Sequence, residues 1–406
     1  MSPRLVKCKY YPNISMQLKR NALLAIVSRS LVSYGYGFIL ILFPLYLKRV
    51  GYPNVEVGVI VFAAMLLNAI LAIFAGMLAD HFGRKYVLIV LLFFFSASSI
   101  TTLGDKNPVL LSLLAGLAGF TSGATGGPIG SGGPLGAVQT AIISEASDRD
   151  TMPKILGIAA ILEMASAMAG AFSVTVASLF EINEYYLFYA AFVVGLISIA
   201  VALLIKDTGL RSPKFFPSLS YKSIFKLSLP TIPCGLGSGL VIPLLSLWFK
   251  IRYGATAGQI GFVFGTMDFA MLVFMWFTPD AASKIGKLKV VVFTRVASSL
   301  AFLLMAFSPA FWLAGLFIIL RGAFAMGGMP VRQSFVMLNV DKSERATANG
   351  STSFSRNSAS SFGAALSGYA MRYSLSMLPF YGGLIALLDP LLYFIMFKEQ
   401  WNSKRK

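Results

Sequence analysis

The chain of 406 residues contains one histidine and two cysteines. The single histidine, His81, leaves no metal site built from histidines and no hydrolase that pairs a serine with a histidine. Cys8 lies in a polar N-terminal tail and Cys234 in an apolar segment, so we expect neither a disulfide nor a metal cluster. No plausible nucleophile–base pair is present, so we expect no enzymatic activity. We also expect no metal and no cofactor.

Charge is also scarce in this sequence. Charged residues make up 12% of the chain, against about 25% in an ordinary soluble domain. Hydrophobic residues make up 57%, and the mean hydropathy is +0.75. This composition predicts a membrane protein that crosses the bilayer many times. The first apolar segment is too long for a signal peptide and lacks a small-residue cleavage site.

Apolar runs of about 20 residues, the length that crosses a bilayer, recur along the whole chain. We place twelve of them, which puts both termini on one side of the membrane. The spans are 21–43, 54–79, 86–104, 108–144, 153–179, 185–205, 225–249, 256–278, 289–307, 309–338, 346–371 and 376–397.

The net charge of +18 comes from 34 Lys and Arg against 16 Asp and Glu. Most of the basic residues fall in the two tails and in the loops that share their side. By the positive-inside rule both termini are cytoplasmic, and we expect a multi-pass protein of the plasma membrane. The basic excess therefore reflects topology and some affinity for anionic lipid, and we expect no nucleic-acid partner.

One short segment lies between the second and third spans: Gly76-Met77-Leu78-Ala79-Asp80-His81-Phe82-Gly83-Arg84-Lys85-Tyr86-Val87-Leu88. Glycines at fixed places in a basic reverse turn allow two membrane helices to close tightly. The segment resembles the loop 2–3 signature of the major facilitator superfamily, G-x-L-a-D-r-x-G-r-k. One position departs from it, since His81 stands where the family usually has arginine.

The resemblance implies an all-α fold of twelve helices in two pseudo-symmetric six-helix bundles, which work by alternating access. It also implies that helices 1, 2, 4, 5, 7, 8, 10 and 11 line a central cavity. Two family motifs are missing. Ala118 stands where the fourth helix would carry an arginine, and Gly170-Ala171-Phe172 is all that remains of the antiporter motif in the fifth helix.

An internal repeat supports the two-bundle architecture, as in many transporters. Shifts of 203, 196 and 193 residues, used in turn along the chain, bring glycines and charges of the two halves into register. The matched pairs are Arg49 and Arg252, Gly51 and Gly254, Gly58 and Gly261, Gly83 and Gly286, Arg84 and Lys287, Gly119 and Gly322, Pro134 and Pro330, Glu145 and Asp341, and Gly170 and Gly363.

We expect five parts in the chain. They are a cytoplasmic N-terminal tail (1–20), an N-terminal six-helix bundle (21–205), a cytoplasmic linker (206–224), a C-terminal six-helix bundle (225–397) and a cytoplasmic C-terminal tail (398–406).

Charges inside a bilayer are costly, from about 3 to over 10 kcal/mol by different measures, so each is a functional candidate. Eight stand well inside spans: Arg29, Glu163, Asp268, Arg295, Arg321, Arg332, Arg356 and Asp389. The family resemblance places Arg295 and Asp389 on outer helices, where a structural role is favoured. Arg332 lies near a helix end and is interpreted as snorkelling toward water.

The substrate and proton-coupling candidates are Arg29, Tyr36, Glu163, Asp268, Arg321 and Arg356. We expect substrate near the midplane between the halves, touching Arg29 and Arg356. An Arg29–Glu163 or an Arg321–Asp268 pair could exchange a proton for substrate.

Two helices carry unusual patterns. In the eleventh span Asn349, Ser353, Arg356, Ser360, Gly363 and Ser367 share one helical face. We interpret this stripe as facing a wet cavity, with close helix packing as the alternative. In the fourth span the glycine-rich stretch 126–134 favours a break or hinge, with ligand contact by exposed backbone as the second interpretation.

The expected function is secondary active transport of a small organic solute, coupled to protons, with export of drugs or metabolites favoured. The alternatives are an uptake symporter of an organic anion and a non-transporting sensor or scaffold of the same fold. The expected partners are the solute, protons and membrane lipids, and we expect a monomer.

The resemblance also implies a conformational latch made of Gly76, Asp80, Gly83, Arg84, Lys85, Glu145, Lys287 and Asp341. Arg84 is expected to pair with Glu145, and the repeat predicts a Lys287–Asp341 counterpart. Asp80 has no repeat partner, because Ser283 replaces it. We expect its carboxylate to reach the N-terminus of the eleventh helix when the cytoplasmic side closes.

Asp80→Asn should shift the population toward the state that is open to the cytoplasm and slow transport, while substrate still binds. A carboxylate at a helix N-terminus is worth about 0.3–2 kcal/mol, so the conformational equilibrium should move by a matching amount. Distances between spin labels on the cytoplasmic ends of the two bundles would measure it. An unchanged distance distribution in the mutant would show that no such latch exists.

Overall fold

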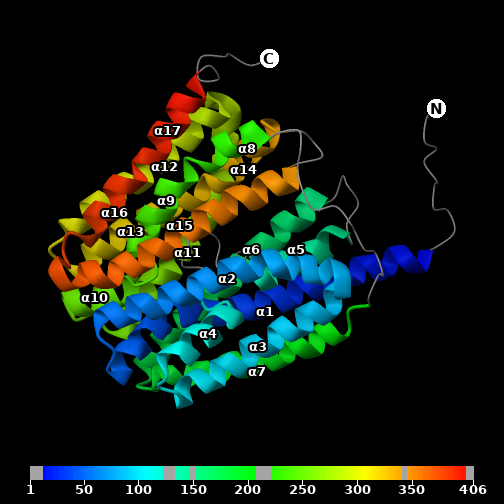
Figure 1. Ribbon diagram of the computed structural model, residues 1–406, viewed down its shortest axis with the longest axis horizontal. Helices are drawn as coiled ribbons and strands as arrows, with labels where there is room; N and C mark the ends of the chain where they lie inside the picture. Colours follow the sequence, from blue (N-terminus) through cyan, green and yellow to red (C-terminus); the bar gives the residue numbers. More distant parts are fainter. Residues whose placement is uncertain (1–11, 122–132, 146–151, 207–220, 341–344, 399–406) are drawn as a thin grey trace.

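The computed structural model describes residues 12–121, 133–145, 152–206, 221–340 and 345–398. Within these ranges the chain folds into helices that form two bundles, with the N-terminal half below and the C-terminal half above in Figure 1. The predicted twelve-helix, two-bundle architecture is confirmed.

The N-terminal bundle begins with α1, which starts at Pro12 and so extends into the segment predicted as a tail. Its fourth crossing consists of two helices, α4 and α5. The bundle contains α1 (Pro12–Val50), α2 (Asn54–Phe82), α3 (Arg84–Gly104), α4 (Pro108–Ala118), α5 (Pro134–Glu145), α6 (Met152–Leu179), the 3₁₀ turn η1 (Glu184–Tyr186) and α7 (Leu187–Leu203).

The C-terminal bundle repeats this order, with several crossings divided into shorter helices. It contains α8 (Tyr221–Ser228), α9 (Thr231–Val241), α10 (Leu245–Tyr253), α11 (Ala257–Ile285), α12 (Lys287–Ala306), α13 (Phe311–Gly327), α14 (Met329–Leu338), α15 (Arg345–Tyr373), α16 (Leu378–Ala386) and α17 (Leu388–Met396).

Ten spans in the described residues are long and apolar enough to cross a membrane. The other two crossings are the divided α4–α5 segment and α15, whose many serines make it too polar for that criterion. The fourth crossing is divided in the described residues: α4 ends at Ala118, its C-cap Gly119 has a left-handed φ of 73°, and α5 begins at Pro134. Most of the stretch 126–134 lies outside the described residues, so the hinge and the ligand contact predicted there stay predictions.

The two signature turns have the same geometry in both halves. Gly83 (φ 101°) ends α2 and donates its N–H to Ala79, and Gly286 (φ 98°) ends α11 and donates to Ala282. Any side chain would be strained at this positive φ, which explains the glycine in each turn. The 203-residue repeat is therefore present in the backbone as well as in the sequence.

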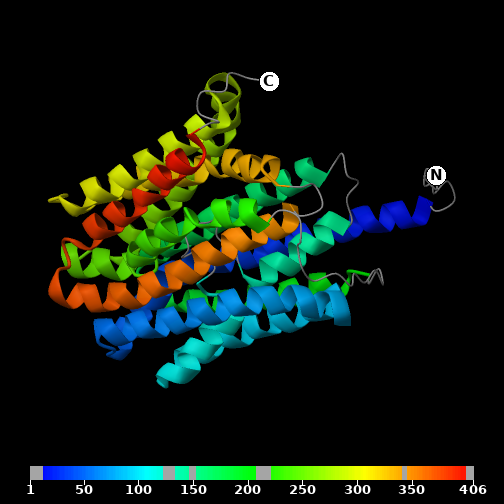
Figure 2. The same cartoon turned by 45° about the horizontal axis from the view of Figure 1, so that its top comes forward.

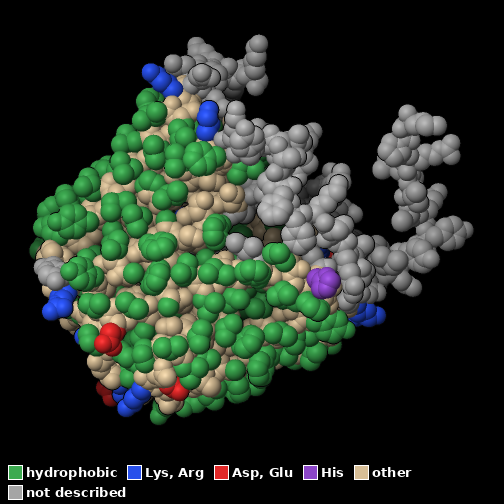
Figure 3. Space-filling view, in the orientation of Figure 1, with side chains coloured by type: hydrophobic (Ala, Val, Ile, Leu, Met, Phe, Trp, Pro, Cys, Tyr) green, Lys and Arg blue, Asp and Glu red, His purple; other side chains and the backbone are tan. Residues whose placement is uncertain are grey.

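The outer surface is apolar, as lipid contact requires. Large side chains such as Leu179, Phe93 and Trp276 are 60–76% exposed on the helix faces. Hydrophobic side chains cover most of the face in Figure 3, and the Lys, Arg, Asp and Glu visible there lie toward its edges.

The two bundles meet through α2 with α15 and through α6 with α11. We call the end with the α1–α2 and α10–α11 turns the distal end, and the end with the α2–α3 and α11–α12 turns the proximal end. At the distal end Gly58 lies against Gly368, and Thr175 donates a hydrogen bond to the Gly258 carbonyl at 3.0 Å. The halves are therefore in close contact there.

The proximal end is spread. A Cβ at Gly76, near the proximal end of α2, would meet no atom within 4 Å, and Phe82 is 61% exposed. Figures 1 and 2 show the halves diverging toward the side where α1 begins. The surface is also hollowed between the halves in Figure 3, beside the residues drawn in grey. The conformation is closed at the distal end and open at the proximal end.

Gly58→Val should prevent closure of the distal end. A Cβ at Gly58 would lie 2.7 Å from the Cα of Gly368, closer than real contacts allow. We expect a longer distance between spin labels on the distal ends of α2 and α15. Gly157→Val is the control, because a Cβ there meets no atom within 4 Å. An unchanged distance in Gly58→Val would contradict this account of the contact.

Candidate functional site

The eight charged residues selected within the predicted spans are all buried. Their exposed fractions range from 0% for Glu163 to 8% for Arg295. A buried charge in a membrane is costly, so it is usually neutralised by a partner or kept because it takes part in the function. The structure divides them into an N-terminal pair, an isolated carboxylate and an arginine-rich cluster in the C-terminal bundle.

The N-terminal pair joins Arg29 of α1 to Glu163 of α6. Both Nε and Nη2 of Arg29 lie 2.7 Å from Glu163 Oε2, and Nη1 donates to Thr140 Oγ1 of α5 at 2.9 Å. The predicted Arg29–Glu163 pairing is confirmed as a contact. The second carboxylate oxygen, Oε1, is buried with no hydrogen-bond partner. Three helices of the N-terminal bundle thus meet at a compensated charge pair.

Asp268 of α11 is isolated. It is 3% exposed, its Oδ2 has no hydrogen-bond partner, and no basic residue forms an ion pair with it in the described part of the chain. The alternative Arg321–Asp268 pairing is therefore wrong for this conformation. Asp268 follows Gly261 and Gly265 at helical spacing, and both glycines pack against α6 of the other bundle. Asp268 continues the face along which the two halves touch.

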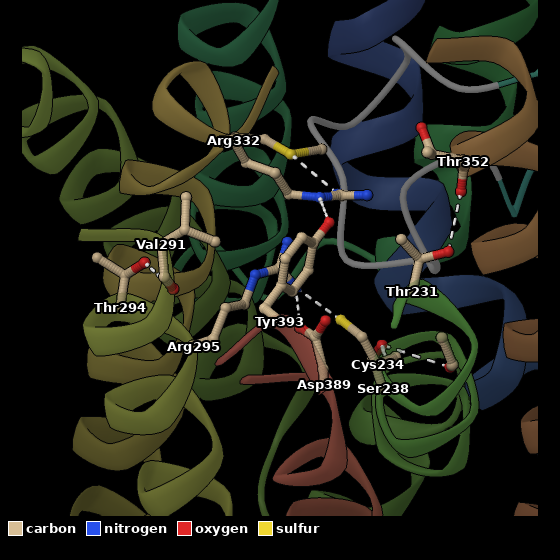
Figure 4. A network of polar contacts seen from close by, with 12 residues as sticks. Thr231, Cys234, Ser238, Val291, Thr294, Arg295, Arg332, Thr352, Asp389 and Tyr393 are labelled. Atoms are coloured by element: carbon tan, nitrogen blue, oxygen red, sulfur yellow. Dashed lines mark hydrogen bonds and ion pairs between the residues drawn. The ribbon is translucent and has the colours of Figure 1, made fainter. Parts of the chain in front are cut away.

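The arginine cluster lies inside the C-terminal bundle. Arg295 of α12 places Nη1 3.3 Å from Asp389 Oδ2 of α17, and the same Nη1 contacts Cys234 of α9 (Figure 4). Arg332 of α14 donates from Nε to the Tyr393 hydroxyl at 3.2 Å. The structural role favoured for Arg295 and Asp389 has a physical basis in this ion pair. Arg332 is 6% exposed and points to Tyr393 (Figure 4), so its predicted snorkelling is wrong.

Arg321 of α13 and Arg356 of α15 have no hydrogen bond or ion pair among the described contacts. The Nε atoms of both are buried without a partner. Arg321 lies over the Phe302 ring, 4.7 Å from its centroid. In this conformation Arg29 bonds to Glu163 and Thr140 of its own bundle, and Arg356 is buried in the other bundle. That one solute touches both arginines stays a prediction.

The polar stripe of α15 packs against α9 more than it faces a cavity. Ser360 and Ser367 are fully buried, and a Cβ at Gly363 would lie 2.6 Å from the Leu236 carbonyl. Gly239 approaches the Ser360 backbone equally closely. The packing alternative therefore holds for this part of the stripe, because small residues let two helix backbones touch.

Tyr36 is also part of the packed interior. It is 2% exposed, and its hydroxyl donates at 2.7 Å to the Ala118 carbonyl at the end of α4. The bond satisfies a carbonyl left free by the break in the fourth crossing. A substrate role for Tyr36 stays a prediction, and in this conformation the residue stabilises the broken helix.

The signature residues lie at the proximal end. Arg84 places Nη1 2.6 Å from Glu145 Oε2 and donates to the Ala141 carbonyl, so the predicted ion pair is confirmed. Lys85 donates to the Leu203 carbonyl at 2.7 Å. These bonds tie α3 to α5 and α7 within one bundle.

The rest of the predicted latch is only partly described. Lys287 donates to Ser334 Oγ at 2.8 Å. Asp341, its predicted partner, and the side chain of Asp80 lie outside the described residues. Both predictions stay open.

Sequence reasoning missed several partners in these contacts, among them Thr140, Cys234, Ser334 and Tyr393. A hydrogen bond between two helices that are distant along the chain produces no local sequence pattern. The opposite signs of Arg295 and Asp389 on two predicted outer helices were the one available signal for their pairing.

Comparison with known proteins now settles the family. The Major Facilitator Superfamily family model matches residues 25–230. The chain belongs to this superfamily. It is a multi-pass membrane transporter of that fold, and the resemblance drawn from the signature turn is confirmed.

Curated relatives include two drug-resistance proteins. Multidrug resistance protein MdtG of Proteus mirabilis (strain HI4320) is 28% identical over 76% of this chain and 79% of its own length. Quinolone resistance protein NorA of Staphylococcus aureus (strain MRSA252) is 21% identical over 70% of this chain and 72% of its own.

Solved structures show the same fold at low identity. Nucleoside transporter NupG has a TM-score of 0.70 at 15% identity, covering 97% of this chain and 100% of its own. The human organic anion transporter MFSD10 has a TM-score of 0.64 at 17% identity, covering 93% and 99%. At these identities the likeness supports the fold alone.

Glu163→Gln should destabilise the folded protein, because it leaves the Arg29 charge buried beside a neutral partner. Breaking a buried pair costs about 3–5 kcal/mol, whereas replacing both partners is often near neutral. We therefore expect a lower thermal unfolding temperature for Glu163→Gln and recovery in the Arg29→Gln/Glu163→Gln double mutant. Asp280→Asn, at an exposed carboxylate, is the control. Equal stability of the single mutant and the wild type would argue against this pair as described.

Proposed function

We propose that this protein is a proton-coupled secondary transporter that exports a drug or metabolite by alternating access of its two bundles. The observation that carries the proposal is Asp268, a buried and unpaired carboxylate on the face where the bundles touch. Two relatives are named for multidrug resistance and quinolone resistance, which supports export.

The position of Asp268 suits a proton carrier. A buried carboxylate without a partner is stable chiefly in its neutral, protonated form. When the halves separate at the distal end, the face around Asp268 would meet water and the carboxylate could take up a proton from outside. Release of that proton on the cytoplasmic side, in exchange for solute, would drive export. Loading and release would then follow the conformation of the transporter.

The orientation follows from charge. By the positive-inside rule we propose that both termini and the proximal end face the cytoplasm, in a plasma membrane. The described conformation would then be open to the cytoplasm and closed to the outside. Arg84 and Glu145 would hold the cytoplasmic part of the N-terminal bundle rigid while the halves rock.

The remaining candidates have secondary roles in the proposal. Arg29 and Glu163 would form a second charge pair that a solute or proton could disturb. Gly76 and Gly83, with Asp80, Lys85, Lys287 and Asp341, would control closure of the cytoplasmic end. We propose a monomer, because each bundle finds its partner within the same chain.

Uptake of an organic anion by symport is the second candidate. The C-terminal bundle favours this candidate, because it buries four arginines. Among its described residues, Asp389 is the acid that forms an ion pair with one of them.

Asp268→Asn should abolish the effect of a pH gradient on transport, because the amide cannot release a proton. The measurement is uptake of a fluorescent quinolone into proteoliposomes, with and without a proton gradient. Binding of the quinolone should survive. Asp280→Asn should behave as wild type. Gradient-driven flux that persists in Asp268→Asn would remove Asp268 from the coupling, and no flux in the wild type would favour a non-transporting role.

A further inference from the structure

Positive charge is concentrated inside the C-terminal bundle. Four arginines from four different helices converge there, each 4–8% exposed: Arg295 on α12, Arg321 on α13, Arg332 on α14 and Arg356 on α15. Arg295 contacts Cys234 of α9, and the next residue of α9, Gly235, packs against the Arg356 backbone. Arg321 lies over Phe302, which stands two helical turns from Arg295 on α12. Among the described residues, Asp389 is the acid that forms an ion pair with this group.

Two of the four arginines have partners. Arg295 contacts Asp389 and Cys234, and Arg332 donates to the Tyr393 hydroxyl. Figure 4 shows these side chains directed toward one another between α9, α12 and α17. Their hydrogen-bonding capacity is used within the bundle.

The other two arginines lack a counter-charge. No described hydrogen bond or ion pair satisfies Arg321 or Arg356, and the Nε of each is buried without an acceptor. The ring of Phe302 faces Arg321 but supplies no acceptor oxygen and no full charge. Two buried cations of one bundle therefore have no counter-charge among the residues that the structure describes.

The depth of these two arginines fits a solute site. Arg321 lies near the middle of the Phe311–Val336 span, and Arg356 near the middle of α15. α15 packs against α2 of the other bundle, so it also links the two halves. In transporters of this kind substrates bind near the midplane between the repeats.

We propose that Arg321 and Arg356 bind one anionic group of the transported solute, a carboxylate, sulfonate or phosphate. The inference rests on the proposed function, which it deepens by naming the substrate class. A planar guanidinium matches such a group with two parallel hydrogen bonds. The bound anion would supply the charge that the described residues leave missing, so its arrival and departure would change the stability of the bundle interior.

The test uses the full-length protein in detergent and four small probes: benzoate, benzylammonium, benzyl alcohol and chloride. Thermal unfolding is followed at constant ionic strength. We expect a saturable rise in melting temperature with benzoate and none with the cationic or neutral analogue. Stabilisation by benzyl alcohol equal to that by benzoate would overturn the proposal. So would chloride that stabilises equally and blocks benzoate, since the site would then hold a resident inorganic ion.

Variants locate the effect. Arg321→Gln and Arg356→Gln should each weaken benzoate binding about 10- to 100-fold, the loss expected for charged hydrogen bonds. Arg372→Gln, at an exposed arginine on the same helix as Arg356, should leave binding unchanged. Wild-type affinity in both cluster variants would refute the site. If either glutamine variant fails to fold, the lysine variants decide, because they keep the charge but should still bind more weakly.

Failure of this inference can be separated from failure of the proposed function. Proton-driven quinolone flux without any benzoate binding would leave the transporter assignment standing and remove the anion site. Benzoate binding that depends on both arginines, in a protein that moves no solute, would remove the transport assignment and leave an anion-binding membrane protein.

Discussion

The free-energy cost of burying a charge in a membrane determines which side chains meet inside each bundle. In the N-terminal half the charge of Arg29 is met by Glu163 and a threonine hydroxyl, so one small network joins α1, α5 and α6. In the C-terminal half the same cost is met only partly, by Asp389 and Tyr393. The two bundles share a backbone plan, and they differ in how completely their interior charges are neutralised.

The paired charges and the unpaired charges would have different roles, the first in stability and the second in function. A compensated pair can hold helices together but offers little to a visiting solute. Within the described ranges Asp268, Arg321 and Arg356 have no counter-charge, so binding of a proton or an anion at each would be favourable. All three belong to the C-terminal bundle, so the proposed work of the transporter lies mainly in that half, while the N-terminal half supplies a rigid counterpart.

Much of the fold could be predicted because its signals are local. The glycine turns at Gly83 and Gly286 each depend on a few adjacent residues, and the Arg84–Glu145 pair followed from a family motif. The site was harder, because helical periodicity shows which residues share a face but not which neighbour covers it. The α15 stripe was therefore assigned to water, although α9 packs against its Ser360–Gly363 part. The Arg295–Asp389 contact joins residues on helices whose neighbours no local pattern specifies.

Glycines shape the distal contact between the halves. At Gly58 and Gly368 the backbones of α2 and α15 meet, whereas in the α6–α11 contact the side chains of Ser178, Val174 and Phe172 lie against Gly258, Gly261 and Gly265. A glycine that receives a side chain from the facing helix has no side chain of its own to move. Small rotations of one half against the other would therefore need rotamer changes mainly on the α6 side of this contact.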